Sequence, residues 1–412
     1  MKIGILTFHR SINYGAVTQC YALTKEIEKR IPGCEVEVID YVPRFRKEKY
    51  IPSIKNFLFG SINRKNRFSF NIKIVMSQAI KLACHPSSMQ LLKKRYKAFS
   101  ASMISLPLSD EIYEDDEVDS FRRKIYGKYD VIVVGSDCVW EWTTVPLPNA
   151  YYLCGDFGCN KMSYAASMGT DSYEMLTDEK KDILSKSVAD FDYIGVRDTS
   201  SEYVLQQLNN LNYRWFHNCD PTTFLDVSSL KEHQQKVERR IRSLNLPSDK
   251  LRIAVMGSDK YGEIARKIFG DSAVYIALYV PNKYCDYEML DLKVLEWASC
   301  FSLFDMTFTT FFHGTMLSLA NYTPVFSFDY LPEREHQVSK LRELYSRLHL
   351  EGFYHRVDGE FTAEKLEELK RTAHEFVTHP PKERIIHALA EEAKTADSFF
   401  ECLENFEAGR SM

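Results

Sequence analysis

The sequence predicts an α/β protein built from two nucleotide-fold-like halves. Strand-like apolar runs alternate with helix patterns along the chain, and a charged stretch at residues 226–250 interrupts this alternation before it resumes at Leu251. A length of 412 residues and a hydrophobic content of 45% suffice for two buried cores. Because open parallel sheets bind ligands beyond the C-terminal ends of their strands, we expect the site in a cleft between two facing domains.

The expected elements can be given as residue ranges. In the first half, the sequence predicts strands at 2–7, 35–41, 130–135, 161–167 and 192–196, and helices at 16–30 and 178–190. In the second half, it predicts strands at 251–257, 273–280, 304–310 and 324–328, and a helix around 288–301. We therefore expect an N-terminal domain at 1–235, a C-terminal domain at 236–380, and a C-terminal helix at 381–412 that packs back across the boundary.

Composition points to a cytoplasmic protein. Residues 1–7 have the pattern of a first strand and not that of a signal peptide, and no apolar run approaches the roughly 18 residues that a membrane span requires. The ten cysteines are scattered without a C-x-x-C pair, which favours reduced core thiols over a disulfide framework or a zinc site. The acidic run at 114–117 is more typical of a solvated loop than of a metal site, so no metal is expected.

Positive charge gathers in one segment. Residues 44–98 contain fourteen Lys or Arg and one acid, Glu48, which gives +13 and leaves −17 for the remainder of a chain whose net charge is −4. Aromatic and aliphatic residues interleave with the basic ones. This pattern indicates either a solvated helical insertion or a surface that meets an anionic membrane or a phosphorylated lipid carrier at the inner membrane face. Nucleic acid is not expected, since no binding motif is present and the pI is about 6.3.

The most informative segment joins the expected strand at 304–310 to an apolar helix pattern. It reads Phe311-Phe312-His313-Gly314-Thr315, which places His313, Gly314 and Thr315 where a helix begins. Free N–H groups and the helix dipole favour an anion there, and Gly314 would let a ligand approach the backbone. A histidine at this point is able to give or take a proton. The alternative is a structural turn in which His313 serves as a satisfied cap.

Two further loops follow strands of the first half. Asn13 and Gly15 lie in the loop ahead of the first helix, where they suit either a tight ligand loop or ordinary N-capping. Gly135, Ser136 and Asp137 follow a short apolar strand. That loop offers close backbone approach and two hydrogen-bonding side chains, although a bare strand-to-helix turn would have a similar sequence.

A buried cation is predicted at Arg197, which ends the expected strand at 192–196. A guanidinium there must meet an anion, because burying it unpaired is costly. Either Asp198 or another acid pairs with it, or it binds a carboxylate or phosphate of a ligand. Asp220, in the turn before the charged stretch, is expected to be a structural cap.

In this order, these segments resemble the polysaccharide pyruvyl transferase family, from the first strand to about residue 360. The resemblance rests on Asn13 to Ala16 with Gln19 and Tyr21 to Leu23, Asp130, Gly135 to Asp137 with Trp140, Ser163 to Ser167 with Gly169, Val196 to Asp198, Asp220 to Thr222, and Phe312 to Thr315 with Ser318 and Pro324. It implies a two-domain fold similar to the GT-B glycosyltransferases. It also implies an enzyme of exopolysaccharide or other cell-surface polysaccharide biosynthesis, which moves pyruvate from phosphoenolpyruvate onto two sugar hydroxyls as a cyclic ketal and releases phosphate.

The resemblance also implies roles for individual residues. His313 matches the donor-site histidine, as a phosphate ligand or proton donor, and Arg197 matches the arginine that faces the donor. Gly135, Ser136 and Asp137 match a Gly-Ser-Asp loop, with Asp137 our candidate base. Gly314 and Thr315 would add N–H donors for phosphoenolpyruvate, which is a co-substrate, so no cofactor is expected.

The acceptor side is expected in the N-terminal domain and the donor side in the C-terminal domain. Asn13, Gly15, Trp140 and Glu141 are the candidate acceptor or loop residues. The chain departs from the family pattern at Cys138, where members usually have Gln, and at Glu141, where they have Asn. Both changes bear on the choice of acceptor sugar.

Two other functions fit the same pattern. A GT-B glycosyltransferase using a nucleotide sugar would share the fold, but no acid that would bind a ribose is evident after Met256 and Gly257. A non-catalytic sugar-binding relative would not need both Arg197 and His313. Phosphoenolpyruvate and a sugar acceptor, either free or lipid-linked, are therefore the expected partners.

Overall fold

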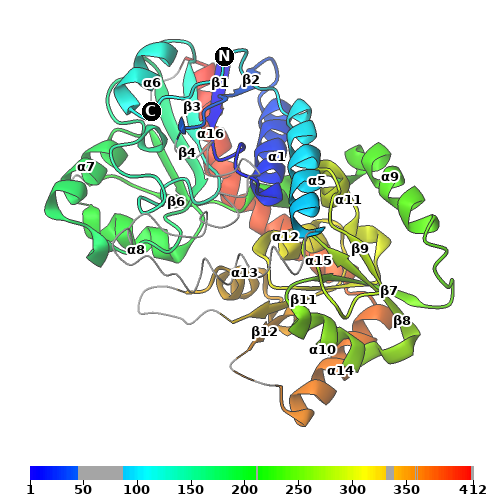
Figure 1. Ribbon diagram of the computed structural model, residues 1–412. Coiled ribbons are helices and arrows are strands. Elements are labelled where there is room, and N and C mark those ends of the chain that lie inside the picture. The colour runs from blue at the N-terminus through cyan, green and yellow to red at the C-terminus, as the bar shows by residue number, and fades with distance from the viewer. Residues whose placement is uncertain (45–86, 210–211, 331–337, 358, 360, 410–412) are drawn as a thin grey trace, which may run out of the picture.

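The computed structural model describes residues 1–44, 87–209, 212–330, 338–357, 359 and 361–409, and shows two α/β domains (Figure 1). Each domain is built around a six-stranded parallel sheet. The predicted fold class, two Rossmann-like domains in a GT-B-like arrangement, is therefore confirmed.

The N-terminal sheet has the order β2-β1-β3-β4-β5-β6. Its strands are β1 (Lys2–Leu6), β2 (Glu35–Val38), β3 (Val131–Val134), β4 (Asn160–Ala166), β5 (Tyr193–Val196) and β6 (Phe216–His217). Helices α1 (Tyr14–Arg30) and α5 (Ser87–Ser102) lie on one face, and α6 (Val118–Ile125), α7 (Asp178–Ala189) and α8 (Thr199–Leu208) on the other. Cover on both faces explains why β3 is an unbroken apolar run.

The C-terminal sheet has the order β12-β11-β10-β7-β8-β9. Its strands are β7 (Leu251–Met256), β8 (Ala273–Leu278), β9 (Tyr287–Met289), β10 (Met306–Thr309), β11 (Val325–Asp329) and β12 (Tyr354–Arg356). The accompanying helices are α9 (Lys231–Arg242), α10 (Asp259–Phe269), α11 (Val294–Ser299), α12 (Phe312–Ala320), α13 (Lys340–Leu348) and α14 (Ala363–Thr378). Counted within the domain, this is the Rossmann order 3-2-1-4-5-6 in reverse.

Some elements differ from the sequence prediction. Helix α1 begins at Tyr14, two residues early, because the Asn13 Oδ1 accepts from the Gly15 N–H at 3.0 Å and caps the helix. The strand predicted at 35–41 ends at Val38, and the helix predicted around 288–301 divides into β9 and α11. Strands β6, β9 and β12 have only two or three residues each, too few for a recognisable period.

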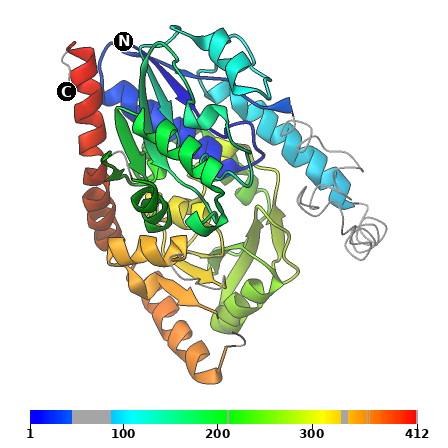
Figure 2. The same ribbon diagram turned by 90° about the vertical axis from the view of Figure 1, so that its left-hand side faces the viewer.

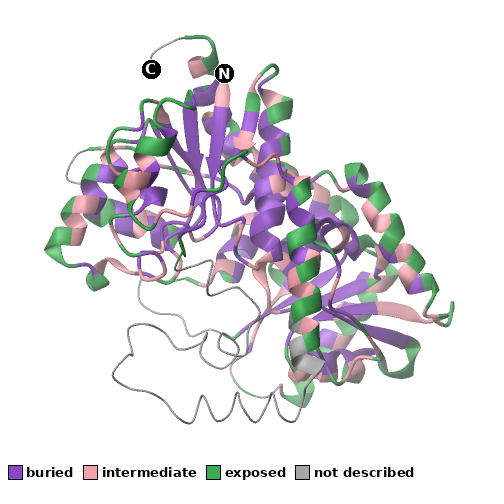
Figure 3. Ribbon diagram, turned by 45° about the horizontal axis from the view of Figure 1, so that its top comes forward, coloured by how far each residue is buried: buried purple, intermediate pink, exposed green. Residues whose placement is uncertain are grey.

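One apolar core runs through both domains. It joins α1 and α5 of the N-terminal domain to α11 and one face of the C-terminal sheet, and Figure 3 shows α1 buried along most of its length. Tyr14 lies at the junction: its hydroxyl donates to the Leu292 carbonyl at 2.7 Å, and its ring packs edge-on against Trp297. The domains thus share buried surface, which limits rigid-body motion between them.

The C-terminal helices also connect the domains. Helices α15 (Lys382–Ala393) and α16 (Asp397–Glu407) run along one side of the molecule, and α16 packs on the N-terminal sheet (Figure 2). Phe399 contacts the rings of Tyr164 and Tyr193, and the Met1 ammonium lies 3.5 Å from the Glu407 carboxylate. The last helix thus belongs to the core of the first domain.

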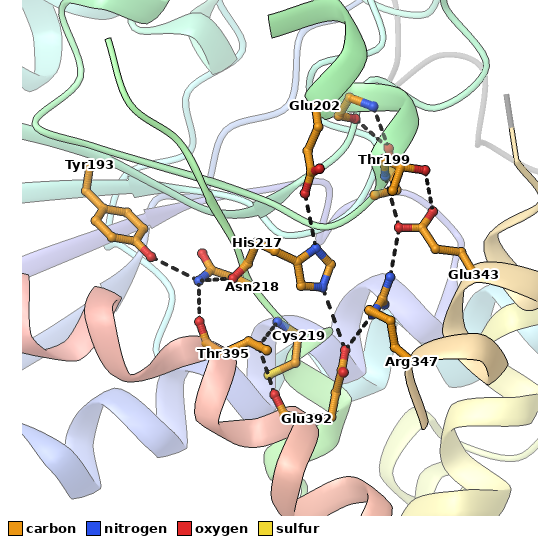
Figure 4. A network of polar contacts seen from close by, with 12 residues as sticks. Tyr193, Thr199, Glu202, His217, Asn218, Cys219, Glu343, Arg347, Glu392 and Thr395 are labelled. Carbon is orange, nitrogen blue, oxygen red and sulfur yellow. Dashed lines mark hydrogen bonds and ion pairs between the residues drawn. The ribbon is translucent and has the colours of Figure 1, made fainter. Parts of the chain in front are cut away.

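A network of polar contacts also joins the two domains at their boundary (Figure 4). Glu343 on α13 accepts from the Thr199 N–H at the start of α8 at 2.9 Å, and Arg347 bridges Glu343 and Glu392 at 2.8 and 3.1 Å. His217 lies 3.7 Å from Glu392. Burial lowers the pKa of His217, but hydrogen bonds that its ring donates to the carboxylates of Glu202 and Glu392 outweigh it, so the pKa is raised.

Much of the basic segment at 44–98 falls on residues 45–86, outside those described. Helix α5 contains the remainder, with Arg95 stacked 4.3 Å from the Tyr279 ring centroid. None of the helices in the described part of the chain has the length and apolarity that a membrane span needs.

Candidate active site

The loops after β1, β3, β5 and β10 meet at the boundary of the two domains. In each sheet the strand order reverses at one point, between β1 and β3 in the first and between β7 and β10 in the second. Crevices at such switch points are the usual ligand sites of open parallel sheets. Here the two switch points face each other.

The loop after β1 is held in place by a buried carboxylate. Asp40 accepts from the Arg10 Nε at 2.7 Å and lies 3.1 Å from the His9 Nε2. Burial alone would raise the pKa of Asp40, but the two basic groups outweigh it and lower the pKa to about 2. This ion pair positions the following residues, Asn13 and Gly15.

His313, the second residue of α12, packs directly on Gly15 of the other domain. A Cβ on Gly15 would lie 1.9 Å from the His313 Cδ2, so only glycine allows the two helix starts to approach this closely. The His313 Nδ1 is buried without a hydrogen-bond partner among the described residues. Burial lowers the pKa of His313 more than Asp220 and Asp137 raise it, so the imidazole is neutral at pH 7.

Arg197 follows β5, and its side chain is 4% exposed. Its Nη1 donates to the Asp220 Oδ2 at 2.9 Å, and its guanidinium lies 5.0 Å from the Phe312 ring centroid. The Nη2 lies 3.9 Å from the Asp137 Oδ1, too far for a hydrogen bond. The anion predicted for Arg197 is therefore Asp220, whereas Asp198 caps α8 by accepting from the Ser201 N–H at 2.9 Å.

Two carboxylates face Arg197 and His313. Asp220 accepts from the Gln19 amide and, as the predicted cap, from the Thr222 N–H at 3.0 Å. Asp137 accepts from the Asn13 Nδ2 at 3.3 Å. Burial would raise the pKa of both acids, but the charge of Arg197 and the other polar neighbours outweigh it, so both pKa values are lowered and both groups are ionised.

Lys340 is a second cation that the sequence did not reveal. It is the first residue of α13, and its Nζ donates to the Cys138 Sγ at 2.9 Å. Its charge lowers the pKa values of Asp137, Asp198 and His313, which places it within the same electrostatic cluster. No strand end or glycine precedes it in the sequence, so no local signal distinguishes it from other lysines.

Several predicted site residues have other roles in the structure. The space at Gly314 is filled by Thr309 and Met256, and the Thr315 hydroxyl bonds Ser327 at 2.6 Å inside the core. The Gly314 α-carbon is therefore enclosed by the core, and ligand contact at its backbone N–H stays a prediction. What α12 offers are the N–H groups of residues 312–314, since its first intrahelical bond runs from the Thr315 N–H to the Phe311 carbonyl.

In the loop after β3, too, some of the predicted site residues lie in the core and others lie beside the charged groups. Gly135 has a φ of +122° and packs so closely on β4 that a Cβ would lie 2.2 Å from the Tyr164 carbonyl oxygen. The Ser136 hydroxyl is buried without a partner among the described residues. Trp140 lies in the core with its indole donating to the Tyr151 carbonyl at 2.8 Å, and Glu141 is hydrogen-bonded by Thr144 and Thr170. Of this loop, only Asp137 and Cys138 contact the charged cluster.

A cavity of about 310 Å³ adjoins His313. Residues of both domains line it, among them Asn13 and Gly15 from the first and Tyr279 and Trp297 from the second. Phe312 also lines it and lies beside the Arg197 guanidinium, so an aromatic cavity borders the charged cluster.

The two facing α/β domains define a GT-B-like fold. Known structures of that fold include a UDP-GlcNAc 2-epimerase from Neisseria meningitidis bound to UDP-GlcNAc, with 8% identity, a TM-score of 0.51, and coverage of 98% of this chain and 100% of that one. A Listeria monocytogenes structure named for the same activity has 10% identity, a TM-score of 0.50, and coverage of 100% and 97%. A search of curated proteins found no match.

The family model for polysaccharide pyruvyl transferase matches residues 13–332. The chain belongs to that family. The matched range contains Asn13, Asp137, Arg197 and His313 but ends before Lys340.

The contact between Gly15 and His313 gives a first prediction. Gly15→Ala should lower both the melting temperature and the activity, the latter about tenfold or more, because the new methyl group overlaps and displaces the His313 ring. Turnover and melting temperature of the variant test this. Gly352→Ala is the matched control, since its added Cβ would have no neighbour within 4 Å. Unchanged turnover in Gly15→Ala would show that the position of His313 is unimportant.

Proposed function

We propose that this protein transfers pyruvate from phosphoenolpyruvate to two hydroxyls of a sugar, in a polysaccharide or its lipid-linked precursor. The product is a cyclic ketal, and phosphate is released. The observation that carries the proposal is the gathering of Arg197, Lys340, Asp137 and His313 where the two sheets face each other. Membership of the pyruvyl transferase family supports the same reaction class.

The donor is a polyanion and requires cations and N–H donors. Arg197 is held by Asp220 through Nη1, which directs Nη2 toward the space beside Asp137. Lys340 lies on the other side of Cys138, and the free N–H groups at the start of α12 add a positive dipole end. We propose that these groups bind the carboxylate and phosphate of phosphoenolpyruvate, in preference to a neutral ligand.

Donor binding would also prepare the acid and the base. A polyanion beside His313 and Asp137 favours protonation and so raises the pKa of both groups. In the proposed reaction His313 protonates the methylene carbon, and C2 gains positive character. One sugar hydroxyl attacks C2 with its proton passing to Asp137. The C2–O bond to phosphate then breaks, and the leaving phosphate takes that proton from Asp137. The second hydroxyl closes the ring at C2, and its proton passes to His313, which replaces the proton given to the methylene carbon. General acid–base help of this kind typically contributes about 10²–10⁴-fold.

The direct test is phosphate release from phosphoenolpyruvate in the presence of galactosides, mannosides and N-acetylhexosaminides. We expect release with at least one acceptor, and a loss of about 10²-fold or more in His313→Ala, with little change in melting temperature. His374→Ala is the control, because His374 lies on α14 against Phe269, away from the cluster. Acceptor-dependent release that persists in His313→Ala would refute the role of His313.

A second variant tests the donor cation. Arg197→Lys keeps the charge but loses the planar fork, so it cannot bind Asp220 and the donor in the same geometry. We expect the KM for phosphoenolpyruvate to rise about tenfold or more, which corresponds to about 1.4 kcal/mol. Steady-state kinetics and thermal melting distinguish a role of Arg197 in donor binding from a purely structural role. A lower melting temperature with an unchanged KM would make Arg197 a purely structural partner of Asp220.

The basic segment at 44–98 suggests where the acceptor is found. Its charge of +13 favours contact with anionic lipid, as a lipid-linked acceptor at the inner membrane face would require. Replacing Arg64, Lys65 and Arg67 with Glu should weaken co-sedimentation with phosphatidylglycerol vesicles at low salt, by about 1 kcal/mol per residue. Neutral phosphatidylcholine vesicles are the control. Absence of wild-type binding to the anionic vesicles would show that the segment is only a solvated surface.

A further inference from the structure

The cavity beside His313 differs in chemistry from the charged cluster. Its walls are Tyr279, Trp297 and Phe311 from the C-terminal domain and Ile12 from the first loop, with Asn13 and His313 at its edge. Its volume of about 310 Å³ is at the lower end for small-molecule sites. The described residues that line it include no Lys, Arg, Asp or Glu, so the lining itself supplies no counter-charge to a phosphate or carboxylate that loses its hydration there.

Trp297 supplies an unused donor at this cavity. Its side chain is 3% exposed, and its Nε1 has no acceptor among the described residues. Buried indole N–H groups usually have a partner, as Trp140 has in the Tyr151 carbonyl at 2.8 Å. An unpaired donor on a residue that lines a cavity is explained if a ligand oxygen completes the bond.

Tyr279 forms the adjoining wall in a strained conformation. Its φ is +68°, in the left-handed region that bulky residues seldom occupy. Its ring is held by Tyr14, Trp297 and Phe311, at centroid distances of 5.5, 5.7 and 5.6 Å. Backbone strain of this kind persists where the surroundings fix a side chain, and it occurs often at binding sites. The aromatic wall is therefore rigid before any ligand enters.

We infer that this cavity binds one hexopyranose ring of the acceptor, with the Trp297 N–H donating to a ring hydroxyl. A pyranose has apolar C–H faces that suit aromatic walls and hydroxyls that suit a few polar groups, which matches the lining. Asn13 joins the cavity to Asp137 through its 3.3 Å hydrogen bond, and Phe312 joins it to Arg197, whose guanidinium lies 5.0 Å from the Phe312 ring centroid. The ring would thus present two hydroxyls to the donor beside His313. The identification of this sugar as the acceptor rests on the proposed function, whereas the binding of a neutral sugar does not.

The test follows the four tryptophan indole N–H signals of the ¹⁵N-labelled full-length protein during titration with hexosides. The probes are methyl β-galactoside, methyl α-mannoside and methyl N-acetyl-β-glucosaminide up to about 50 mM, with uridine as the nucleoside comparison. We expect at least one hexoside to shift the Trp297 signal, identified by its absence in Trp297→Phe, and to leave the signal of Trp215 unmoved. No hexoside shift at 50 mM, or tighter binding of uridine than of every hexoside, would overturn the inference.

Kinetics give an independent readout. Trp297→Phe keeps the aromatic ring and removes the donor, so the KM for the acceptor should rise about fivefold to thirtyfold while the KM for phosphoenolpyruvate changes less than twofold. Trp142→Phe is the matched control, because its indole N–H is also buried without a partner among the described residues but lies in the core of the N-terminal domain. Equal acceptor KM values in the two variants would overturn the role of Trp297.

The two proposals fail in distinguishable ways. A hexoside-dependent shift of the Trp297 signal without phosphate release would retain the sugar site and reject pyruvyl transfer. Phosphate release with an acceptor that leaves the Trp297 signal unmoved would retain pyruvyl transfer and place the acceptor elsewhere.

Discussion

The packing of His313 on Gly15 sets the distance between the two sheets. These residues begin α12 and α1, one in each domain, and a single methyl group on Gly15 would separate them. Because both helices start at a switch point of their own sheet, this contact brings two crevices together. The shared apolar core around Tyr14 and Trp297 holds the contact from one side. The network from Thr199 through Glu343 and Arg347 holds it from the other.

Most of the charged groups in the site pair with another polar group of the site. Burial of an arginine and an aspartate is costly, and an ion pair repays that cost only when its geometry is good. Asp220 satisfies Arg197 through one nitrogen, while Gln19 and Thr222 fix the carboxylate itself. This arrangement leaves the second terminal nitrogen without a hydrogen bond to Asp137. Replacing Asp220 would therefore disturb both the stability of the fold and the direction in which Arg197 points.

The sequence allowed the fold class to be predicted, because strand and helix periods alternate clearly and break at 226–250. The strand-end rule also located Asn13, Asp137, Arg197 and His313, which the structure brings together. Their roles in catalysis remain predictions. The rule failed for Lys340, since a lysine that opens a helix has no local signature. It also gave no sign that α12 packs so closely at Gly314 and Thr315 on Thr309, Met256 and Ser327.

The two compartments beside His313 explain why one site needs both domains. A polyanion and a neutral ring require opposite surroundings, the first cations and N–H groups, the second apolar walls with few polar groups. A single strand-end crevice supplies mainly one of these environments. Here Arg197 comes from the first domain and Lys340 from the second, and the aromatic cavity is likewise shared between them. Any motion that separated Gly15 from His313 would open both compartments at once, so the reacting groups are held in register by the same contact that joins the domains.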